Sequence, residues 1–221
     1  MAITAAMVKE LREMTGAGMM DCKKALTETN GDMDAAVDVL KKSGAAKMEK
    51  KQSRIAAEGI ARVAVNGNVA VVAEVNSETD FVAKNETFQE FVQTVADTAL
   101  ASDLNGGANG EDIEALLATN GLSDLLVEKT ATIGEKLSVR RFAKVTGDAV
   151  ASYIHGGGRI GVVIAADGAS DDAAKEALTN IAMQVAAMNP QYISRNDISA
   201  EELAKIKEIT IDSALNDATT L

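Results

Sequence analysis

The sequence predicts an α+β protein that begins with a three-helix module and continues, after a linker, into a core of two repeated α+β subdomains with antiparallel sheets. Three observations support this fold class. Apolar residues recur at helical spacing near the N-terminus, short β-type runs begin at residue 59, and an order of hairpin then helix occurs twice. The expected segments are 1–44 for the helical module, 45–58 for the linker, 59–147 for the first core subdomain and 148–221 for the second.

The helical module is predicted from three apolar stripes, each long enough for one short helix. Gly16 and Gly18 separate the first stripe from the second, and Asn30-Gly31 separates the second from the third. Asp32 can cap the third helix, and Gly44 is expected to end it. The stripe residues are Met7, Val8, Leu11, Met14, Cys22, Ala25, Leu26, Met33, Val37 and Leu40.

The linker and the first core subdomain follow from a change of pattern. Residues 45–58 are charge-rich with little apolar periodicity, which is typical of a solvated, partly helical linker. GIARVAV and VAVVAEV then flank Asn66-Gly67, a pair that favours the positive-φ turn of a two-residue hairpin. Asn85 can cap the next helix, and an alternating run at 136–145 can add a further strand to the sheet.

The second core subdomain repeats the same order. VASYI, the loop HGGG, RIGVVIAA and a helix closed by Asn189-Pro190 form its hairpin and helix. Ser199 and Glu202 match a capping box that opens one more helix. The strand equivalent to 136–145 would come after residue 221, so we expect an incomplete second sheet. Because an uncovered sheet edge is a template for pairing, self-association through this subdomain is a possible consequence.

Composition narrows the classes of partner and compartment. A hydrophobic content of 47% in 221 residues is enough for a sizeable core. The net charge of −11 disfavours nucleic acid and anionic membranes, so a protein or small-molecule partner is expected. Cys22 is the single cysteine and has no nearby histidine, which favours a small buried residue over a zinc ligand or a nucleophile. No secretion signal is recognisable, so the cytoplasm is the expected compartment.

The glycine-rich stretch after residue 154 resembles two chemical motifs, but the surrounding sequence lacks what each of the two sites would need. HGGG matches the oxyanion loop of esterases, but G-x-S-x-G is absent and His155, the single histidine, would lie in that loop itself. GGGRIG formally matches a dinucleotide fingerprint, yet the residues after it indicate a strand where a helix is needed. A glycine-rich hairpin turn with a surface His155 is therefore favoured, and no cofactor or metal is expected.

Two apolar features lie where burial is not assured. Met19 and Met20 follow a glycine turn, and methionine adapts well to shallow contact surfaces, although both could equally fill the core of their own module. Phe81 lies in the polar stretch SETDFVAKN, on an expected connecting loop where binding residues are common. The alternative is that Phe81 packs under its own helix.

Two longer motifs resemble one known family. TGAGMMDCKKAL at 15–26 and TDFVAKN at 79–85 closely resemble the signature segments of the bacterial elongation factor Ts family, and the resemblance extends to HGGGRIGV at 155–162 and to Asn189-Pro190. It implies a guanine-nucleotide exchange factor for elongation factor Tu that acts in translation elongation and is not an enzyme in the chemical sense. The implied fold is a ubiquitin-associated-like helical module followed by two α+β subdomains.

The resemblance also implies which residues meet the partner. In the family the T-D-F-V segment enters the G domain of the partner near the magnesium and nucleotide site, which makes Phe81 a wedge and Asp80 its polar neighbour. The helical module and the glycine-rich hairpin are implied to contact the same partner. The implied contact residues are Thr79, Asp80, Phe81, Val82, Arg12, Met19, Met20 and His155.

Two expectations from the sequence qualify this interpretation. Family members commonly continue with a helical hairpin and a final strand, so a chain that stops at Leu221 is expected to be a truncated or a short form. The residues alone also leave two other functions open. A scaffold or peptide-binding protein would depend on Met19 and Met20 but not on Phe81, and a hydrolase would depend on His155.

Overall fold

The computed structural model describes residues 2–168 and 170–216, and it confirms the predicted α+β class: three N-terminal helices precede further helices and two small antiparallel sheets. The chain divides into two compact units between Ala186 and Ala187. The elements are α1 (Ala5–Thr15), α2 (Met19–Glu28), α3 (Met33–Glu49), β1 (Glu58–Asn66), β2 (Val69–Ser77), α4 (Asp80–Ala83), α5 (Glu86–Ala101), α6 (Ile113–Leu117), α7 (Leu122–Ile133), β3 (Ser138–Thr146), β4 (Ala149–His155), β5 (Ile160–Ala166), α8 (Asp172–Met188), η1 (Arg195–Asp197) and α9 (Ala200–Asn216).

The first three helices pack around a small core of their own. Thr4 caps α1 by accepting a hydrogen bond from the Met7 amide at 3.3 Å, and Asp32 caps α3 by accepting one from the Ala35 amide at 3.0 Å. The predicted cap at Asp32 is thus confirmed, and Cys22 is buried as expected. The buried residues of this core are Val8, Leu11, Cys22, Ala25, Leu26 and Ala36.

The third helix continues past Gly44, where the sequence predicted its end. Helix α3 runs on to Glu49, and Gly44 is buried against α7. A Cβ atom at Gly44 would lie 3.1 Å from Cγ1 of Val127 and 3.6 Å from Cβ of Ala131. The missing side chain therefore allows α3 and α7 to approach closely, and this packing offsets the cost of a helical glycine, about 1 kcal/mol. The prediction failed because the reason for the glycine lies in another helix.

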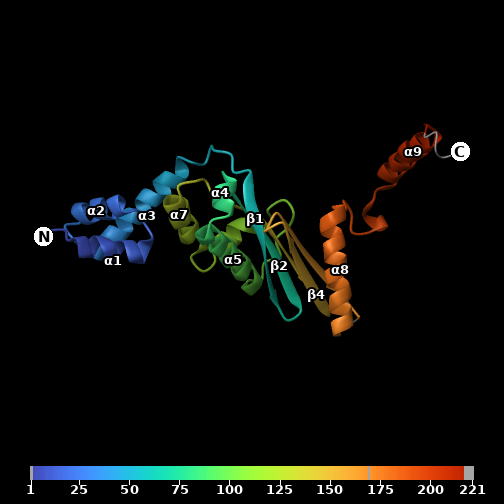
Figure 1. Ribbon diagram of the computed structural model, residues 1–221, viewed down its shortest axis with the longest axis horizontal. Coiled ribbons are helices and arrows are strands. Elements are labelled where there is room, and N and C mark those ends of the chain that lie inside the picture. Colours follow the sequence, from blue (N-terminus) through green and yellow to red (C-terminus); the bar gives the residue numbers. More distant parts are fainter. Residues whose placement is uncertain (1, 169, 217–221) are drawn as a thin grey trace. The chain divides into compact units, whose positions relative to one another are not determined.

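A three-stranded antiparallel sheet in the order β1-β2-β3 forms the centre of the first core subdomain. Asn66 pairs with Val69, so the two turn residues are Gly67 and Asn68, one position later than predicted, and Gly67 has a φ of 58°. Helix α5 packs against this sheet, and α7 contacts α5 and α3 (Figure 1). The largest fully buried side chains of the core between this sheet and the helices include Phe88, Phe91 and Phe142.

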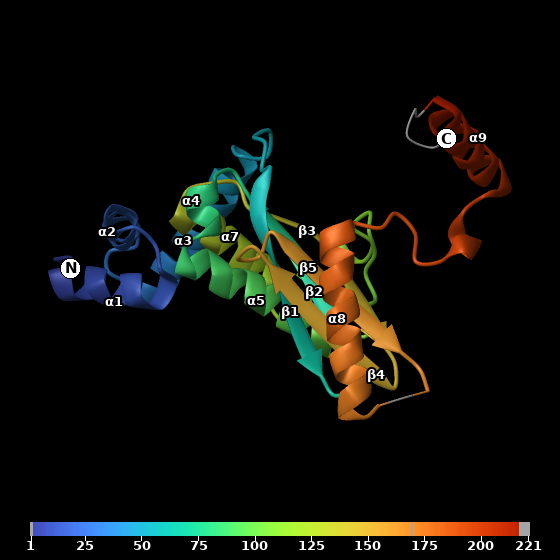
Figure 2. The same cartoon turned by 45° about the vertical axis from the view of Figure 1, so that its right-hand side comes forward.

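The second sheet lies against the other face of the first. It consists of β4 and β5 among the described residues. A Cβ atom at Gly161 would lie 2.8 Å from Cγ2 of Val72 and 2.9 Å from Cβ of Ala61, so the two sheets approach closely there. Leu178 of α8 packs with apolar residues of β4 and β5, and Figure 2 shows α8 beside these strands. The layers are therefore α5, the first sheet, the second sheet and α8, in that order.

The C-terminal unit contains η1 and α9. The Ser199 half of the predicted capping box is present, because the Ser199 hydroxyl accepts a hydrogen bond from the Glu202 amide at 3.2 Å. The Glu202 carboxylate instead accepts a hydrogen bond from the hydroxyl of Tyr192. A complete capping box occurs earlier, at Ser194 and Asp197.

Candidate functional site

Phe81 differs from the other phenylalanines in being exposed to solvent. Its exposed fraction is 81%, whereas Phe88, Phe91 and Phe142 are at most 1% exposed. The alternative that Phe81 packs under its own helix is therefore wrong. The hydrophobic gain of about 2 kcal/mol that burial of such a ring brings remains unused in the free chain. This ring is the principal candidate for contact with a partner.

Phe81 lies on a single helical turn rather than on the predicted loop. Helix α4 is capped by Thr79, whose Oγ1 accepts a hydrogen bond from the Val82 amide at 3.4 Å. Ala83 is buried in the main core and Val82 packs against it. Because one side of the turn is anchored in this way, the opposite side presents the Phe81 ring to solvent.

Asp80 is the charged neighbour of the ring on the same turn. The Lys84 Nζ atom lies 2.7 Å from Asp80 Oδ2, one helical turn further along the chain. The hydrogen bond and positive charge of Lys84 lower the pKa of Asp80 below its ordinary value. Asp80 is therefore a carboxylate at neutral pH, and the turn presents an anion beside an apolar ring.

Glu135 holds the start of this turn from across the subdomain. One carboxylate oxygen, Oε2, accepts hydrogen bonds from the backbone amides of Glu78 and Thr79, both at 3.0 Å. The other oxygen, Oε1, accepts from the Thr79 hydroxyl at 2.6 Å. Three donors of two adjacent residues thus bind one half-buried side chain, and such bonds to a charged acceptor are stronger than neutral ones.

Glu78 makes the reciprocal contact, and we call Glu78 and Glu135 together the carboxylate clamp. Glu78 Oε1 accepts a hydrogen bond from the Lys136 amide at 2.5 Å and lies 3.3 Å from a guanidinium nitrogen of Arg54. The ammonium group of Lys136 donates to the backbone carbonyls of Gln52 and Arg54, at 2.7 and 2.9 Å. The clamp therefore also fastens the segment that precedes β1.

The ionisation of Glu78 should make part of the stability depend on pH. The hydrogen bond from the Lys136 amide, followed by the bond and charge of Arg54, lowers the pKa of Glu78 below its ordinary value of about 4.5. A lowered pKa means that the folded state prefers the carboxylate, so this stabilisation is complete above the ordinary pKa and is lost as the pH falls through the lowered one. We expect the difference in free energy of unfolding between wild type and Glu78→Gln to shrink from about pH 6 to about pH 3. Denaturant unfolding at several pH values measures it, and a difference that stays constant or grows towards low pH would contradict the role of this carboxylate.

His155 lies at the end of β4, next to the glycine-rich turn, and is exposed as predicted. Its Nδ1 atom is 3.0 Å from the Tyr153 hydroxyl. Gly156, Gly157 and Gly158 all have positive φ, and strand β5 follows them, which excludes the helix that a dinucleotide site needs. The predicted hairpin turn is therefore confirmed.

The glycine-rich turn and the Phe81 turn lie at the same end of β1. The Ala61 amide of β1 donates a hydrogen bond to the Gly158 carbonyl at 2.7 Å. Helix α4 also contacts β1, and the charge of Arg159 contributes to the lowered pKa of Asp80. In Figures 1 and 2, the β4–β5 turn and α4 are both found near the start of β1. The structure thus brings two of the predicted contact regions together.

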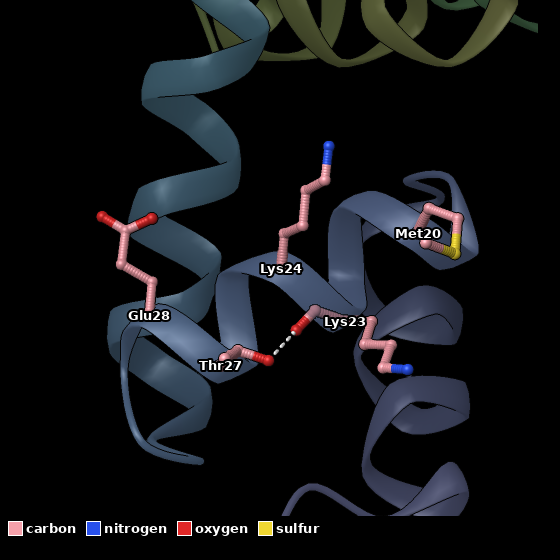
Figure 3. A pocket seen from close by; sticks show the side chains of 5 residues that line it. All are labelled: Met20, Lys23, Lys24, Thr27 and Glu28. Carbon is pink, nitrogen blue, oxygen red and sulfur yellow. Dashed lines mark hydrogen bonds between the residues drawn. The ribbon is translucent and has the colours of Figure 1, made fainter.

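The helical module exposes its two adjacent methionines. Met19 and Met20 are 57% and 65% exposed, so the alternative that they fill the core of the module is wrong. Arg12 is exposed as well, on the last turn of α1. Met20 also lines a shallow pocket of about 370 Å³ on α2, which Figure 3 shows together with the side chains of Lys23 and Lys24. An adaptable apolar surface with basic side chains nearby fits a protein partner better than a small ligand.

The end of α7 connects this surface to the Phe81 turn. The Thr132 hydroxyl on the last turn of α7 donates to the Gly16 carbonyl at 3.3 Å, just before the exposed methionines. Gly134 ends α7 with a φ of 87°, and Glu135 of the clamp follows directly. The segment from Thr132 to Glu135 therefore contacts both the glycine turn of the module and the start of α4.

Sequence reasoning missed the clamp entirely. Glu135 and Lys136 have no motif around them, and an acidic residue after a helix is usually a solvated surface group. The signal that could have pointed to Glu78 is its place directly before the T-D-F-V segment. For Glu135 only the folded chain reveals the role, since its partners lie more than fifty positions earlier in the sequence.

The described residues contain neither a metal-binding cluster nor a helix that could span a membrane. No group of three or more His, Cys, Asp or Glu side chains within them is arranged to hold a metal ion. None of the helices in residues 2–168 and 170–216 combines the length and the apolar character needed to cross a membrane.

A comparison with protein families bears on the same segment. The family model described as Elongation factor TS matches residues 78–219, which is more than half of the chain. The match begins at Glu78 of the clamp and includes Thr79–Val82 and His155. The helical module, with Arg12, Met19 and Met20, lies outside the matched residues.

Proposed function

Because the chain belongs to the elongation factor Ts family, we propose that it binds elongation factor Tu with GDP and promotes GDP release by inserting the Thr79–Val82 segment near the magnesium and nucleotide site. Family membership itself supports a general role in nucleotide exchange on elongation factor Tu during protein biosynthesis. The single observation that carries the finer mechanism is Phe81, an 81% exposed ring on an anchored turn.

The proposed mechanism is differential binding. Burial of the Phe81 ring is worth on the order of 2 kcal/mol, which corresponds to about thirtyfold in an equilibrium constant. If the pocket for this ring opens only in the form of elongation factor Tu that has lost GDP, the chain favours that form by the same factor. By linkage, the chain then weakens GDP as strongly as GDP weakens the chain. No covalent bond is made or broken, so the chain is not an enzyme in the chemical sense.

Asp80 adds an electrostatic contribution to this mechanism. Its carboxylate is ionised at neutral pH because Lys84 lowers its pKa, and it lies next to the inserting ring. An anion brought close to the phosphates of GDP raises their free energy, and it also competes with them for the magnesium ion. Both effects favour release of the nucleotide.

Arg12, Met19 and Met20 form the proposed docking surface of the helical module, and His155 adds a contact from the glycine-rich turn. These residues are exposed, and the methionines can adapt to a partner surface. Their proposed role is to raise the affinity for elongation factor Tu, whereas Phe81 acts on the nucleotide. The ubiquitin-associated-like character of the module is part of the same proposal.

Met19→Ala combined with Met20→Ala is expected to raise the concentration of chain needed for half-maximal GDP release by about tenfold, with a nearly unchanged maximal rate. Two exposed apolar contacts are lost while the Phe81 turn stays intact. Release of fluorescent GDP at increasing concentrations of chain separates the two quantities. Met188→Ala is a matched control, because Met188 is 74% exposed on α8. A lower maximal rate at an unchanged half-saturating concentration would contradict the docking role.

The same assay tests the proposed function as a whole. Acceleration of GDP release by the wild-type chain supports exchange, and its absence at saturating concentration would overturn the proposal. A scaffold protein that uses only the helical module would bind without acceleration and would be indifferent to a change at Phe81. A hydrolase would lose turnover with His155→Ala and would need no protein partner.

The proposal also covers the compartment, other classes of partner and self-association. A chain that acts on elongation factor Tu is placed in the cytoplasm, and its net charge of −11 argues against direct binding to nucleic acid or to anionic membranes. Self-association through the second subdomain is proposed because β4 and β5 form a sheet of two strands within the described part of the chain. Sedimentation at several concentrations tests it, and a monomer at all of them would contradict it.

A further inference from the structure

We propose that Glu135 is a positioning residue for nucleotide exchange: it fixes the start of α4, and thereby the direction in which Phe81 points, before the partner arrives. This inference rests on the proposed function and names a residue through which the same site is built. Glu135 itself is not assigned a contact with elongation factor Tu.

The clamp lies where the regular pairing of the sheet stops. Strands β2 and β3 pair as far as Asn76 and Ser138. Beyond this last pair the segments that continue from β2 and β3 no longer pair with each other. The amides of Glu78 and Thr79 bond to the Glu135 carboxylate instead. The clamp thus extends the connection between two chain segments past the end of the sheet.

The contact is reciprocal, and both of its sides are anchored. Glu135 accepts from the backbone of residues 78 and 79, while Glu78 accepts from the backbone of Lys136. On one side Leu137 is buried in the main core, and on the other side Ala83 is buried in the same core. The clamp therefore spans only the short stretch that the core does not hold, which is the stretch that leads into Phe81.

This location predicts a local effect rather than a global one. Loss of the Glu135 carboxylate leaves the paired strands and the buried core residues in place. It frees the Thr79 cap and the first residues of α4, so that Phe81 has to be ordered again when it inserts into the partner. Ordering a few backbone residues at that moment is expected to slow maximal GDP release by about tenfold.

The test is a double-mutant cycle between Glu135→Ala and Phe81→Ala, measured as the maximal rate of GDP release from elongation factor Tu. If Glu135 acts through Phe81, Glu135→Ala costs about tenfold in the wild-type background and less than about twofold in the Phe81→Ala background. Glu135→Gln should lose less, because its amide oxygen can still accept from both backbone amides. Glu114→Ala, a change at an exposed glutamate on α6, is the matched control and should have no effect.

A second readout works without the partner. Hydrogen exchange of the amides from Glu78 to Asn85 should become faster in Glu135→Ala, while the amides of β2 keep their protection. Equal losses of release rate in both backgrounds, or a uniform loss of protection across the sheet, would overturn the positioning role. Phe81→Ala and wild type separate the two proposals: full exchange by Phe81→Ala would refute insertion of the Phe81 ring, and absence of exchange by wild type would refute the proposed function, whatever the hydrogen exchange of Glu135→Ala shows.

Discussion

Phe81→Ala is expected to reduce the acceleration of GDP release from elongation factor Tu by about tenfold to thirtyfold, while the protein keeps its fold. The ring is 81% exposed, so its removal leaves no cavity in the core. The free energy of unfolding should therefore change by less than about 0.5 kcal/mol. Stopped-flow release of fluorescent GDP and denaturant unfolding measure the two quantities on the same preparation.

Two companion variants sharpen this prediction. Phe81→Leu keeps an apolar side chain of smaller size and should retain an intermediate release rate, whereas Phe81→Asp should be no better than alanine. Lys84→Ala is a control for the turn itself. It removes the exposed ion pair with Asp80 but leaves the ring, so it should slow GDP release much less than Phe81→Ala does. Undiminished exchange by Phe81→Ala would refute the wedge role of this residue.

Phe88→Ala is expected to have the opposite profile and to lower the free energy of unfolding by about 3 to 5 kcal/mol. Phe88 is fully buried on the first turn of α5, within the core that the first sheet shares with α5 and α7. Removal of its ring loses apolar burial and leaves a cavity that the packed neighbours fill only in part. The midpoint of denaturant unfolding measures the loss.

The two phenylalanine variants control each other, because the chemical change is the same and only the surroundings differ. At temperatures where Phe88→Ala is still folded, it should accelerate GDP release nearly as well as wild type. A loss of stability of similar size in both variants would contradict the assignment of Phe88 to the core and of Phe81 to a partner.

Much of the fold follows from local patterns in the sequence. Asn85 was predicted to cap a helix, and its Oδ1 accepts a hydrogen bond from the Phe88 amide at 3.2 Å. The alternating run predicted at 136–145 is β3, Ser138–Thr146, and it pairs with β2 in the first sheet. Such features depend on residues within one or two turns of the chain, so periodicity and capping chemistry are sufficient to find them.

The predicted element boundaries are wrong where contacts between residues distant in the sequence determine where a helix ends or a turn lies. Gly44 resembles a helix end in isolation, but its place in α3 is set by Val127 and Ala131 of another helix. The hairpin turn is at Gly67-Asn68, one residue later than predicted, because the pairing of Asn66 with Val69 fixes the register of β1 and β2. In both cases the local signal was read correctly as a glycine preference but given the wrong cause or position.

The exposed residues of the candidate site could be predicted from the sequence, but the carboxylate clamp that holds the Phe81 turn could not. A large ring among polar neighbours singled out Phe81, and an adjacent pair of methionines singled out the module surface; the structure leaves both exposed. Exposure does not test contact, so the contact roles stay predictions for every residue of the site: Arg12, Met19, Met20, Thr79, Asp80, Phe81, Val82 and His155. The clamp could not be predicted, because a hydrogen bond between Glu135 and the backbone of Thr79 leaves no pattern in the sequence.

One measurement tests the differential-binding mechanism most directly. The dissociation constants of wild type and Phe81→Ala for elongation factor Tu are determined twice, once without nucleotide and once with saturating GDP and magnesium. We predict that GDP weakens the binding of wild type at least about ten times more than it weakens the binding of Phe81→Ala, because the ring accounts for much of the preference for the nucleotide-free form. An equal weakening of both proteins by GDP would contradict the claim that Phe81 couples partner binding to nucleotide release.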